Sequence, residues 1–169
     1  YMCFSRPDSM LGGLSIYEVR KAMGRELAKE SAVDADVIVP IPDSGVPAAL
    51  GYAQETGIPF ELGIIRNHYV GRTFIEPTQK VRELGVKLKH SANRSVVEGK
   101  RVLLADDVRN TGETFARAKA AIEEAGGTVI GTVEICDRLE AIVDVGVPNF
   151  ALTEYKAPEN HPVANCPLC

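Results

Sequence analysis

The sequence predicts an α/β fold in which helices flank a mostly parallel sheet of five strands. Short apolar segments that fit buried strands alternate along the chain with longer segments whose apolar residues recur at helical intervals. The chain has 169 residues, of which 45% are hydrophobic and 25% are charged. No repeat, low-complexity tract or linker interrupts the alternation, so we expect one domain over residues 1–169.

The first part of the chain predicts a helix, a strand and a second helix. Ser15 and Glu18 have the capping-box spacing, and apolar residues then recur at helical intervals, which predicts a helix over about 15–30. The apolar run 37–41 predicts a buried strand. Residues 42–45, which include Pro and Gly, end this strand before a helix over 46–55.

The rest of the chain repeats the alternation. Apolar runs predict strands over 58–65, 102–105, 128–135 and 149–152. A helix over about 112–125 follows the third strand, and Gly126 and Gly127 stop it. Ligands of parallel sheets bind at the carboxyl ends of the strands, so we expect the functional residues there.

Composition argues against two classes of function. The net charge of -4 is unsuited to a general nucleic-acid binder. No stretch approaches the roughly 20 apolar residues that a membrane helix requires, and the first residues lack the pattern of a secretion signal. We therefore expect a cytoplasmic protein that binds neither nucleic acid nor a membrane.

Positive charge is concentrated in residues 66–101. This segment holds nine Lys or Arg and three Glu, a net charge of +6, so the rest of the chain carries -10. A short basic segment in an acidic protein suits a compact polyanion such as a phosphorylated metabolite. A solvated charged face would have the same composition, and charge alone leaves both interpretations open.

Residues 102–114 carry the sharpest motif. The expected strand leads to Asp106 and Asp107, and a turn with Thr111 and Thr114 then opens a helix. Amide N–H groups at a helix start, together with the two hydroxyls, form a cradle for a phosphate dianion. Carboxylates accept hydrogen bonds from a vicinal diol, so the motif predicts a ribose 5-phosphate site. Adjacent acids alone would more often be surface or capping residues, but strand, acids, glycine turn and helix in this order favour the site.

This motif resembles the phosphoribosylpyrophosphate (PRPP) binding motif of type I phosphoribosyltransferases. Upstream, residues 4–9, 40–45 and 66–79 are similar to the phosphoribosyltransferase domain of the amidophosphoribosyltransferase family. The resemblance covers about residues 1–110 and is most specific in the Tyr-Val-Gly-Arg-Thr-Phe-Ile run of residues 69–75. It implies the type I phosphoribosyltransferase fold, with a flexible loop over about 66–90 and a small hood.

The same resemblance implies roles for individual residues. Arg72, Asp106 and Asp107 would be catalytic. Arg72 would stabilise the departing pyrophosphate, and the acids would hold the ribose and meet Mg²⁺ through water or substrate. The flexible loop, which closes over PRPP in that family, would include Tyr69, Gly71, Arg72 and Thr73. The 5-phosphate would bind Asn110, Thr111, Gly112, Glu113 and Thr114, and the pyrophosphate would bind Asp43, Ser44 and Gly45.

The tail resembles a different branch. Residues 129–169 are similar to the tail of orotate-type phosphoribosyltransferases, and the Asn110–Thr114 run resembles nucleobase-type members. The amidotransferase family also carries an N-terminal glutaminase domain, which these 169 residues do not supply.

The expected function is Mg²⁺-dependent transfer of the phosphoribosyl group from PRPP to ammonia. The product would be 5-phosphoribosylamine, made in the first committed step of purine synthesis, and a separate glutaminase is a candidate partner. A nucleobase (orotate-type) phosphoribosyltransferase and a non-catalytic PRPP-binding regulator remain alternatives. Analogy with the fold family implies a homo-oligomer.

The four cysteines allow a further interpretation. Some amidophosphoribosyltransferases bind an iron-sulfur cluster through cysteines in the same order along the chain. We nevertheless expect Cys136, on a predicted strand, to be a buried thiol rather than a cluster or zinc ligand. Disulfides are not expected in a cytosolic chain. The candidate ligands are Cys3, Cys136, Cys166 and Cys169.

Overall fold

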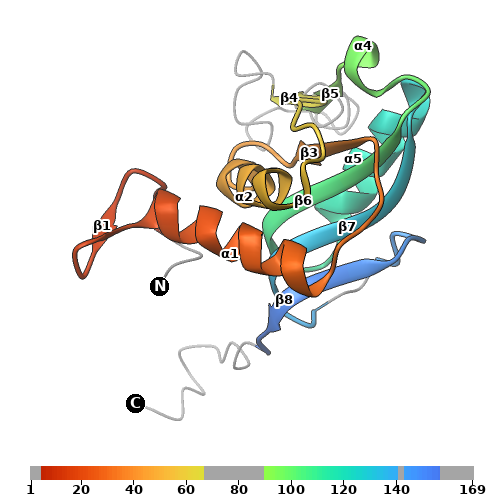
Figure 1. Ribbon diagram of the computed structural model, residues 1–169. Coiled ribbons are helices and arrows are strands. Elements are labelled where there is room, and N and C mark those ends of the chain that lie inside the picture. The colour runs from red at the N-terminus through yellow and green to blue at the C-terminus, as the bar shows by residue number, and fades with distance from the viewer. Residues whose placement is uncertain (1–4, 67–89, 141–142, 157–169) are drawn as a thin grey trace, which may run out of the picture.

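The computed structural model describes residues 5–66, 90–140 and 143–156. Its centre is a four-stranded parallel sheet in the order β3-β6-β7-β8, with helices on both faces (Figure 1). The strands are β3 (Val37–Pro40), β6 (Arg101–Arg109), β7 (Thr128–Asp137) and β8 (Asn149–Glu154). In the part of the chain that the structure describes, no helix has the length and apolar character needed to span a bilayer.

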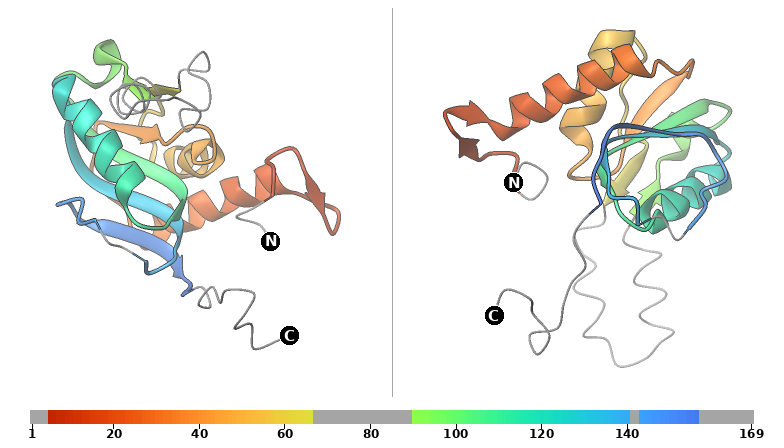
Figure 2. Two further views of the ribbon diagram at one scale, coloured as in Figure 1. Left: turned by 180° about the vertical axis from the view of Figure 1, so that it is seen from behind. Right: turned by 90° about the horizontal axis from the view of Figure 1, so that it is seen from below.

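Helices α1 (Ile16–Glu30) and α2 (Val46–Thr56) cover one face of the sheet. Helix α5 (Glu113–Glu124) covers the other face, as the view from behind shows (Figure 2). A hydrophobic cluster lies on each side: one joins the sheet to α5, and the other joins it to α1 and α2. The predicted α/β class, with a parallel sheet flanked by helices, is confirmed.

Three smaller elements complete the described structure. Strands β1 (Met10–Leu11) and β2 (Leu14–Ser15) form a hairpin that projects away from the sheet (Figure 1). Strands β4 (Ile64–Arg66) and β5 (His90–Ala92) pair antiparallel, and the short helix α4 (Arg94–Val97) follows them. The expected flexible loop falls almost entirely on residues 67–89, which lie outside the described ranges, and the hood stays a prediction.

The predicted helices form at the expected places. The Ser15 hydroxyl accepts a hydrogen bond from the Glu18 amide at the start of α1, as the capping box requires. Helix α2 ends at Gly57, whose φ of 73° is left-handed. The Tyr52 hydroxyl, fully buried on α2, donates to the Ser31 carbonyl and accepts from the Val33 amide, which fixes the end of α1 against α2.

The predicted strand over residues 58–65 does not form as one strand of the sheet, which has four strands in the described ranges where five were predicted. Phe60 makes one parallel bridge to Ile38 on β3, and the amide of Gly63 then donates to the carbonyl of Glu61. This local turn takes the chain away from the sheet edge, so that β4 pairs with β5 instead.

The expected end of β6 at Ala105 was also wrong. The strand continues to Arg109, because pairing with β7 extends beyond the four residues that pair with β3. Asp106 and Asp107 are therefore part of the sheet and not of a loop after it.

Glycines let α1 and α2 approach each other closely. A methyl group on Gly51 of α2 would collide with the backbone carbonyl of Lys21 on α1, and one on Gly24 would collide with the carbonyl of Ala48. Neither backbone atom can move as a flexible side chain would. Contact between the helix backbones thus depends on two positions without a side chain.

We expect Gly51→Ala to destabilise the fold by about 1–3 kcal/mol, the cost typical of overpacking. The sign of this stability change is diagnostic, because Gly→Ala at an unpacked helical position stabilises the fold by about 1 kcal/mol. Urea unfolding followed by circular dichroism measures the change. Gln54→Ala, on the exposed side of the same helix, is the control and should leave the stability nearly unchanged. A stabilised Gly51→Ala variant would contradict the packing described.

Candidate active site

An open pocket of about 360 Å³ lies where β3 and β6 end. Its walls come from five parts of the chain: the N-terminal segment, α1, the loop after β3, β4 and β6. The lining residues are Ser5, Pro7, Arg20, Pro42, Asp43, Ser44, Arg66 and Asp107. The pocket thus brings together two predicted motifs: the pyrophosphate loop, through Asp43 and Ser44, and the acid pair on β6, through Asp107.

The loop after β3 lies directly on the end of β6. The amide of Ile41 donates to the carbonyl of Ala105 at 2.8 Å, and the amide of Gly45 donates to the carbonyl of Ile41 at 3.0 Å. A Cβ atom on Gly45 would lie 2.6 Å from the Ala105 carbonyl oxygen and 2.9 Å from the Asp106 Cα. Glycine at position 45 therefore lets the predicted pyrophosphate loop pack against the strand that carries the acids.

Asp106 connects that loop to β6. Its Oδ1 accepts hydrogen bonds from the Ser44 hydroxyl at 3.2 Å and from the Asp107 amide at 2.8 Å. The residue is 6% exposed. Burial, followed by the charge of Asp107, raises the pKa of Asp106 well above its usual range. Asp106 lies behind the pocket and does not line it.

Asp107 points to the other side of the strand. Its Oδ2 lies 3.3 Å from Nη2 of Arg20 on α1, and both side chains are less than one-tenth exposed. The sequence motif treats the two acids as a pair. In the structure, Asp107 lines the pocket in an ion pair, whereas Asp106 is hydrogen-bonded to the loop behind it.

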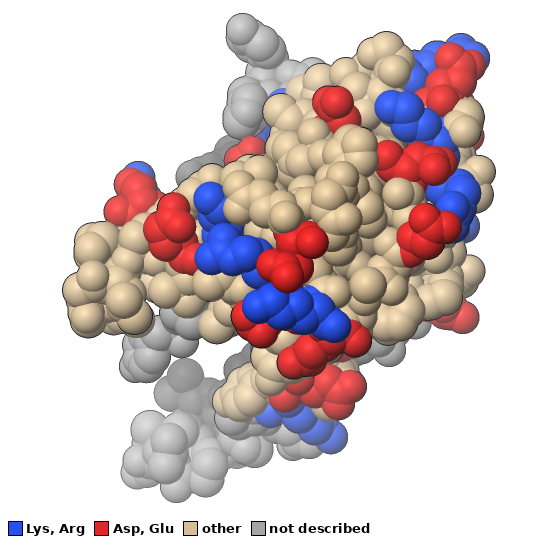
Figure 3. All heavy atoms as spheres, in the orientation of Figure 1, with Lys and Arg blue, Asp and Glu red and all other residues tan. Residues whose placement is uncertain are grey.

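The described arginines of the basic segment 66–101 are paired with carboxylates. Arg66 contacts Asp43 at 2.9 Å, within the pocket. Arg94 contacts Glu98 and Arg101 contacts Asp34. Basic and acidic side chains are interspersed on the face seen in Figure 3. The remaining flexible-loop candidates lie outside the described residues; they are Tyr69, Gly71, Arg72 and Thr73.

The predicted phosphate loop joins the end of β6 to α5. Gly112 has a φ of 84°, and a Cβ atom there would lie 2.7 Å from the Val143 carbonyl oxygen, so the position favours glycine on two counts. The Thr111 hydroxyl accepts a hydrogen bond from the Glu113 amide at 3.4 Å, and the Thr111 carbonyl accepts one from the Val143 amide at 3.0 Å. Asn110 and Thr114 are exposed beside this turn. The first-turn amides of α5 favour an anion at this end.

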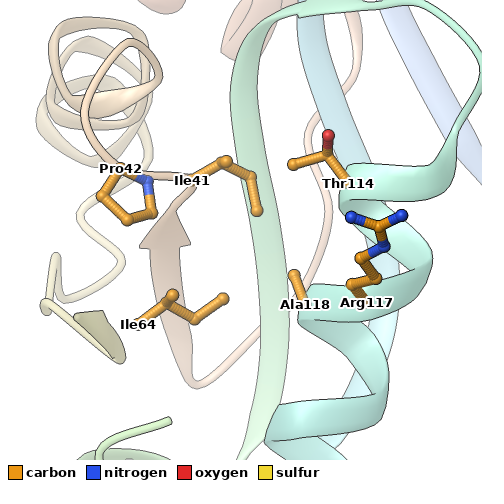
Figure 4. A pocket seen from close by; sticks show the side chains of 6 residues that line it. All are labelled: Ile41, Pro42, Ile64, Thr114, Arg117 and Ala118. Carbon is orange, nitrogen blue, oxygen red and sulfur yellow. The ribbon is translucent and has the colours of Figure 1, made fainter. Parts of the chain in front are cut away.

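A smaller cavity of about 50 Å³ lies between the two predicted phosphate-binding loops (Figure 4). Ile41, Pro42 and Ile64 line one side, and Thr114, Arg117 and Ala118 of α5 line the other. The cavity is too small for a nucleobase or a sugar phosphate. Its apolar walls instead join the loop after β3 to the first turns of α5.

A group of buried polar residues on β6, β7 and β8 has no counterpart in the sequence motifs. Glu134 on β7 is fully buried, and its Oε1 accepts a hydrogen bond from the side-chain Nδ2 of Asn149 at 2.7 Å. The other oxygen, Oε2, and Nε of buried Arg109 have no hydrogen-bond partner among the described residues. Burial raises the pKa of Glu134 to about 7; the Asn149 hydrogen bond and the Arg109 charge oppose this shift, and the Asp137 charge adds to it. Glu134 is the single acidic residue in the otherwise apolar run 128–135, and this is the sequence signal that could have revealed the group.

Comparison with known proteins identifies the family. A model of the phosphoribosyl transferase domain matches residues 15–153. The chain belongs to the phosphoribosyl transferase domain family.

The relatives extend this result. The chain is 67% identical to an amidophosphoribosyltransferase of Rhizobium etli over 126 residues, which cover 75% of this chain and 25% of that protein. It is 51% identical to the glutamine PRPP amidotransferase of Bacillus subtilis solved with ADP and GMP, with a TM-score of 0.69, covering 79% of this chain and 29% of that one. The predicted resemblance to amidophosphoribosyltransferases is confirmed, and the chain spans about a quarter of the length of the curated relatives it matches.

The orotate-type likeness is weaker. The orotate phosphoribosyltransferase of Aeropyrum pernix superposes with a TM-score of 0.55 at 20% identity, covering 84% of this chain and 73% of that one. Such a likeness shows the shared fold alone. The residues of the predicted orotate-type tail that follow position 156 lie outside the described ranges.

The metal ligands predicted from the sequence of this phosphoribosyl transferase domain remain predictions. Within residues 5–66, 90–140 and 143–156, no three His, Cys, Asp or Glu side chains are grouped so that they could hold a metal ion. Cys136 is buried on β7, as predicted. Cys3, Cys166 and Cys169 lie outside the described residues, so a cluster or zinc site is untested.

We expect Glu134→Gln to change how stability depends on pH. A folded-state pKa of about 7, above the ordinary 4.5, means that Glu134 favours folding below pH 4.5. This contribution is lost as the pH rises to about 7. The neutral amide of glutamine does not titrate, so the variant should gain up to about 3 kcal/mol relative to wild type between pH 4.5 and pH 8.

Denaturant unfolding at several pH values measures this difference. Glu124→Gln, at an exposed position on α5, serves as the control. A stability difference between Glu134→Gln and wild type that stays constant across this range would refute the shifted titration.

Proposed function

We propose that this domain transfers the phosphoribosyl group of PRPP to ammonia, giving 5-phosphoribosylamine and pyrophosphate. The observation that carries the proposal is the meeting of Asp43, Ser44 and Asp107 at one pocket. The phosphate loop leaves the same end of β6. The names of the relatives support the same activity.

Each part of the proposed site has a chemical task. The amides and hydroxyls of the Asn110–Thr114 loop bind the 5-phosphate, and Asp107 accepts hydrogen bonds from the ribose hydroxyls. Asp106 supports this arrangement by holding Ser44. Ser44 and the backbone around Gly45 contact the pyrophosphate beside Asp43.

The reaction exchanges one bond at C1 of the ribose. The nitrogen lone pair of ammonia forms the new C–N bond, and pyrophosphate leaves with the electron pair of the C1–O bond. The extra proton on nitrogen passes to solvent. Because positive charge develops on the sugar and negative charge on the leaving group, the protein acts mainly by position and electrostatics.

Mg²⁺ fits the carboxylate donors at this end of β6 as a substrate-bound ion. The carboxylates of Asp106 and Asp107 are hard oxygen donors, but Asp106 is hydrogen-bonded and Asp107 is ion-paired. Mg²⁺ commonly binds to one or two carboxylates together with substrate phosphates and water. When bound with PRPP, the ion would neutralise charge on the pyrophosphate.

The flexible loop completes the proposal. Closure of residues 66–89 over PRPP would exclude water, which otherwise hydrolyses the substrate. Arg72 in this loop would stabilise the departing pyrophosphate. Glutamine can serve as nitrogen source only if a glutaminase delivers ammonia to the pocket. A homo-oligomer is proposed by analogy alone.

The acceptor separates this proposal from its alternative. The Asn-Thr-Gly-Glu-Thr run at 110–114 and the tail favour a nucleobase acceptor, whereas the loop after β3 and the segment 66–79 favour ammonia. A planar base needs a shaped pocket with hydrogen-bonding edges, but ammonia needs little more than a closed, dry cavity.

We expect Mg²⁺-dependent pyrophosphate release from PRPP with ammonium at alkaline pH, but not with glutamine. A coupled pyrophosphate assay should compare ammonium, glutamine, orotate, purine bases and no acceptor. Release only with a base would replace ammonia by a nucleobase as the acceptor. Tight PRPP binding without turnover would make the chain a regulator, and absence of both would exclude a PRPP site.

We expect Asp107→Asn and Arg72→Ala each to lower the rate of pyrophosphate release by about 100-fold or more. This is the scale on which the loss of one preorganised electrostatic contact acts. Asp34→Asn is the matched control, because this carboxylate is 92% exposed and pairs with Arg101 at the start of β6, the opposite end of the strand from Asp107. Wild-type rates in either site variant would remove that residue from the proposed mechanism.

A further inference from the structure

Arg20 is a buried cation in the wall of the pocket that no predicted motif contains. It lies on α1, is 3% exposed and contacts two partners through the same terminal nitrogen, Nη2. One partner is the Ser5 carbonyl at 3.1 Å, and the other is Oδ2 of Asp107 at 3.3 Å. A single nitrogen thus bridges the N-terminal segment and the acid on β6.

The pocket contains two ion pairs of different character. The side chains of Arg66 and Asp43 are 41% and 62% exposed, so this pair is solvated and costs little to separate. The side chains of Arg20 and Asp107 are 4% and 9% exposed. Separating a buried pair leaves a charge without compensation, which is far more costly. The first pair can open for a ligand, whereas the second is fixed.

Burial alone does not account for the position of Arg20. α1 presents its apolar residues Ile16, Leu27 and Ala28 to the core, and an arginine among them must find a partner. Its partner is the one carboxylate of the Asp106–Asp107 pair that lines the pocket. The guanidinium stays charged at any ordinary pH, so the pair with Asp107 persists across the range in which the enzyme would be assayed.

We propose that Arg20 is a positioning residue, which holds the Asp107 carboxylate in the orientation that receives the ribose hydroxyls and ties it to the Ser5 segment of the pocket wall. This inference rests on the proposed PRPP site. Arg20 acts through Asp107 and makes no contact with the reacting atoms. Its loss should therefore weaken PRPP binding and leave the use of the acceptor unchanged.

The test measures binding of Mg²⁺-PRPP by calorimetry, together with steady-state kinetics. Arg20→Gln should weaken PRPP affinity by about 10- to 100-fold, the range expected when a buried charged group loses its partner. KM for PRPP should rise, and KM for the acceptor should not. Arg20→Lys keeps the charge and should recover part of the affinity. Arg25→Gln, on the same helix but outside the pocket lining, is the control and should bind as wild type does.

A double-mutant cycle separates positioning from general support of the fold. In the Asp107→Asn background, where the carboxylate is already lost, Arg20→Gln should change PRPP affinity by less than about twofold. The double variant also has no unpaired buried charge, so it remains a test if Arg20→Gln alone does not fold. A large further loss in this background, or wild-type affinity in Arg20→Gln, would overturn the role of Arg20.

The outcome for wild type distinguishes this inference from the proposed function. If wild type binds PRPP and the Arg20 variants bind equally well, only the positioning role fails. If wild type does not bind PRPP at all, the proposed site fails and the role of Arg20 fails with it.

Discussion

The site depends on the parallel pairing of β3 with β6. Four residue pairs, from Val37 with Val102 to Pro40 with Ala105, bring the two strands to the same edge of the sheet. The loop after β3 and the acids of β6 then meet although about 60 residues separate them. The Ile41–Ala105 hydrogen bond and the close approach of Gly45 continue this contact beyond the last pair. A shift of one residue in the register would move Asp107 away from the pocket.

The two ends of the central strand β6 differ in polarity: the amino-terminal part is apolar and the carboxyl-terminal part carries charged side chains. After the exposed Arg101, β6 continues with Val102, Leu103 and Leu104, all fully buried, whereas the strand ends among buried charged groups. These polar side chains cost desolvation free energy and contribute less to stability than apolar ones would. The apolar half of the sheet provides the stability that lets the other half hold a charged site.

Local patterns predicted the helices and most of the strands, because capping residues, apolar period and glycine stops lie within a few residues of one another. The acid motif located Asp107, and the family resemblance named Asp43 and Ser44; the structure brings all three to one pocket. The local patterns missed Arg20 and Glu134, because the partners of these residues come from elements distant in sequence. They treated Asp106 and Asp107 as equivalent because β6 was expected to end at Ala105. Once the strand continues, successive side chains must point to opposite faces.

The contact between the phosphate loop and Val143 links two parts of the domain that the motifs keep apart. The Thr111 carbonyl accepts from the Val143 amide, and the Gly112 backbone lies against the Val143 carbonyl. The connection between β7 and β8 thus lies against the proposed phosphate cradle. Residues of this connection cannot change in length or shape without moving the cradle. If the proposed 5-phosphate site is correct, a change of length in this connection would alter PRPP binding even though the connection lies outside the sequence motifs.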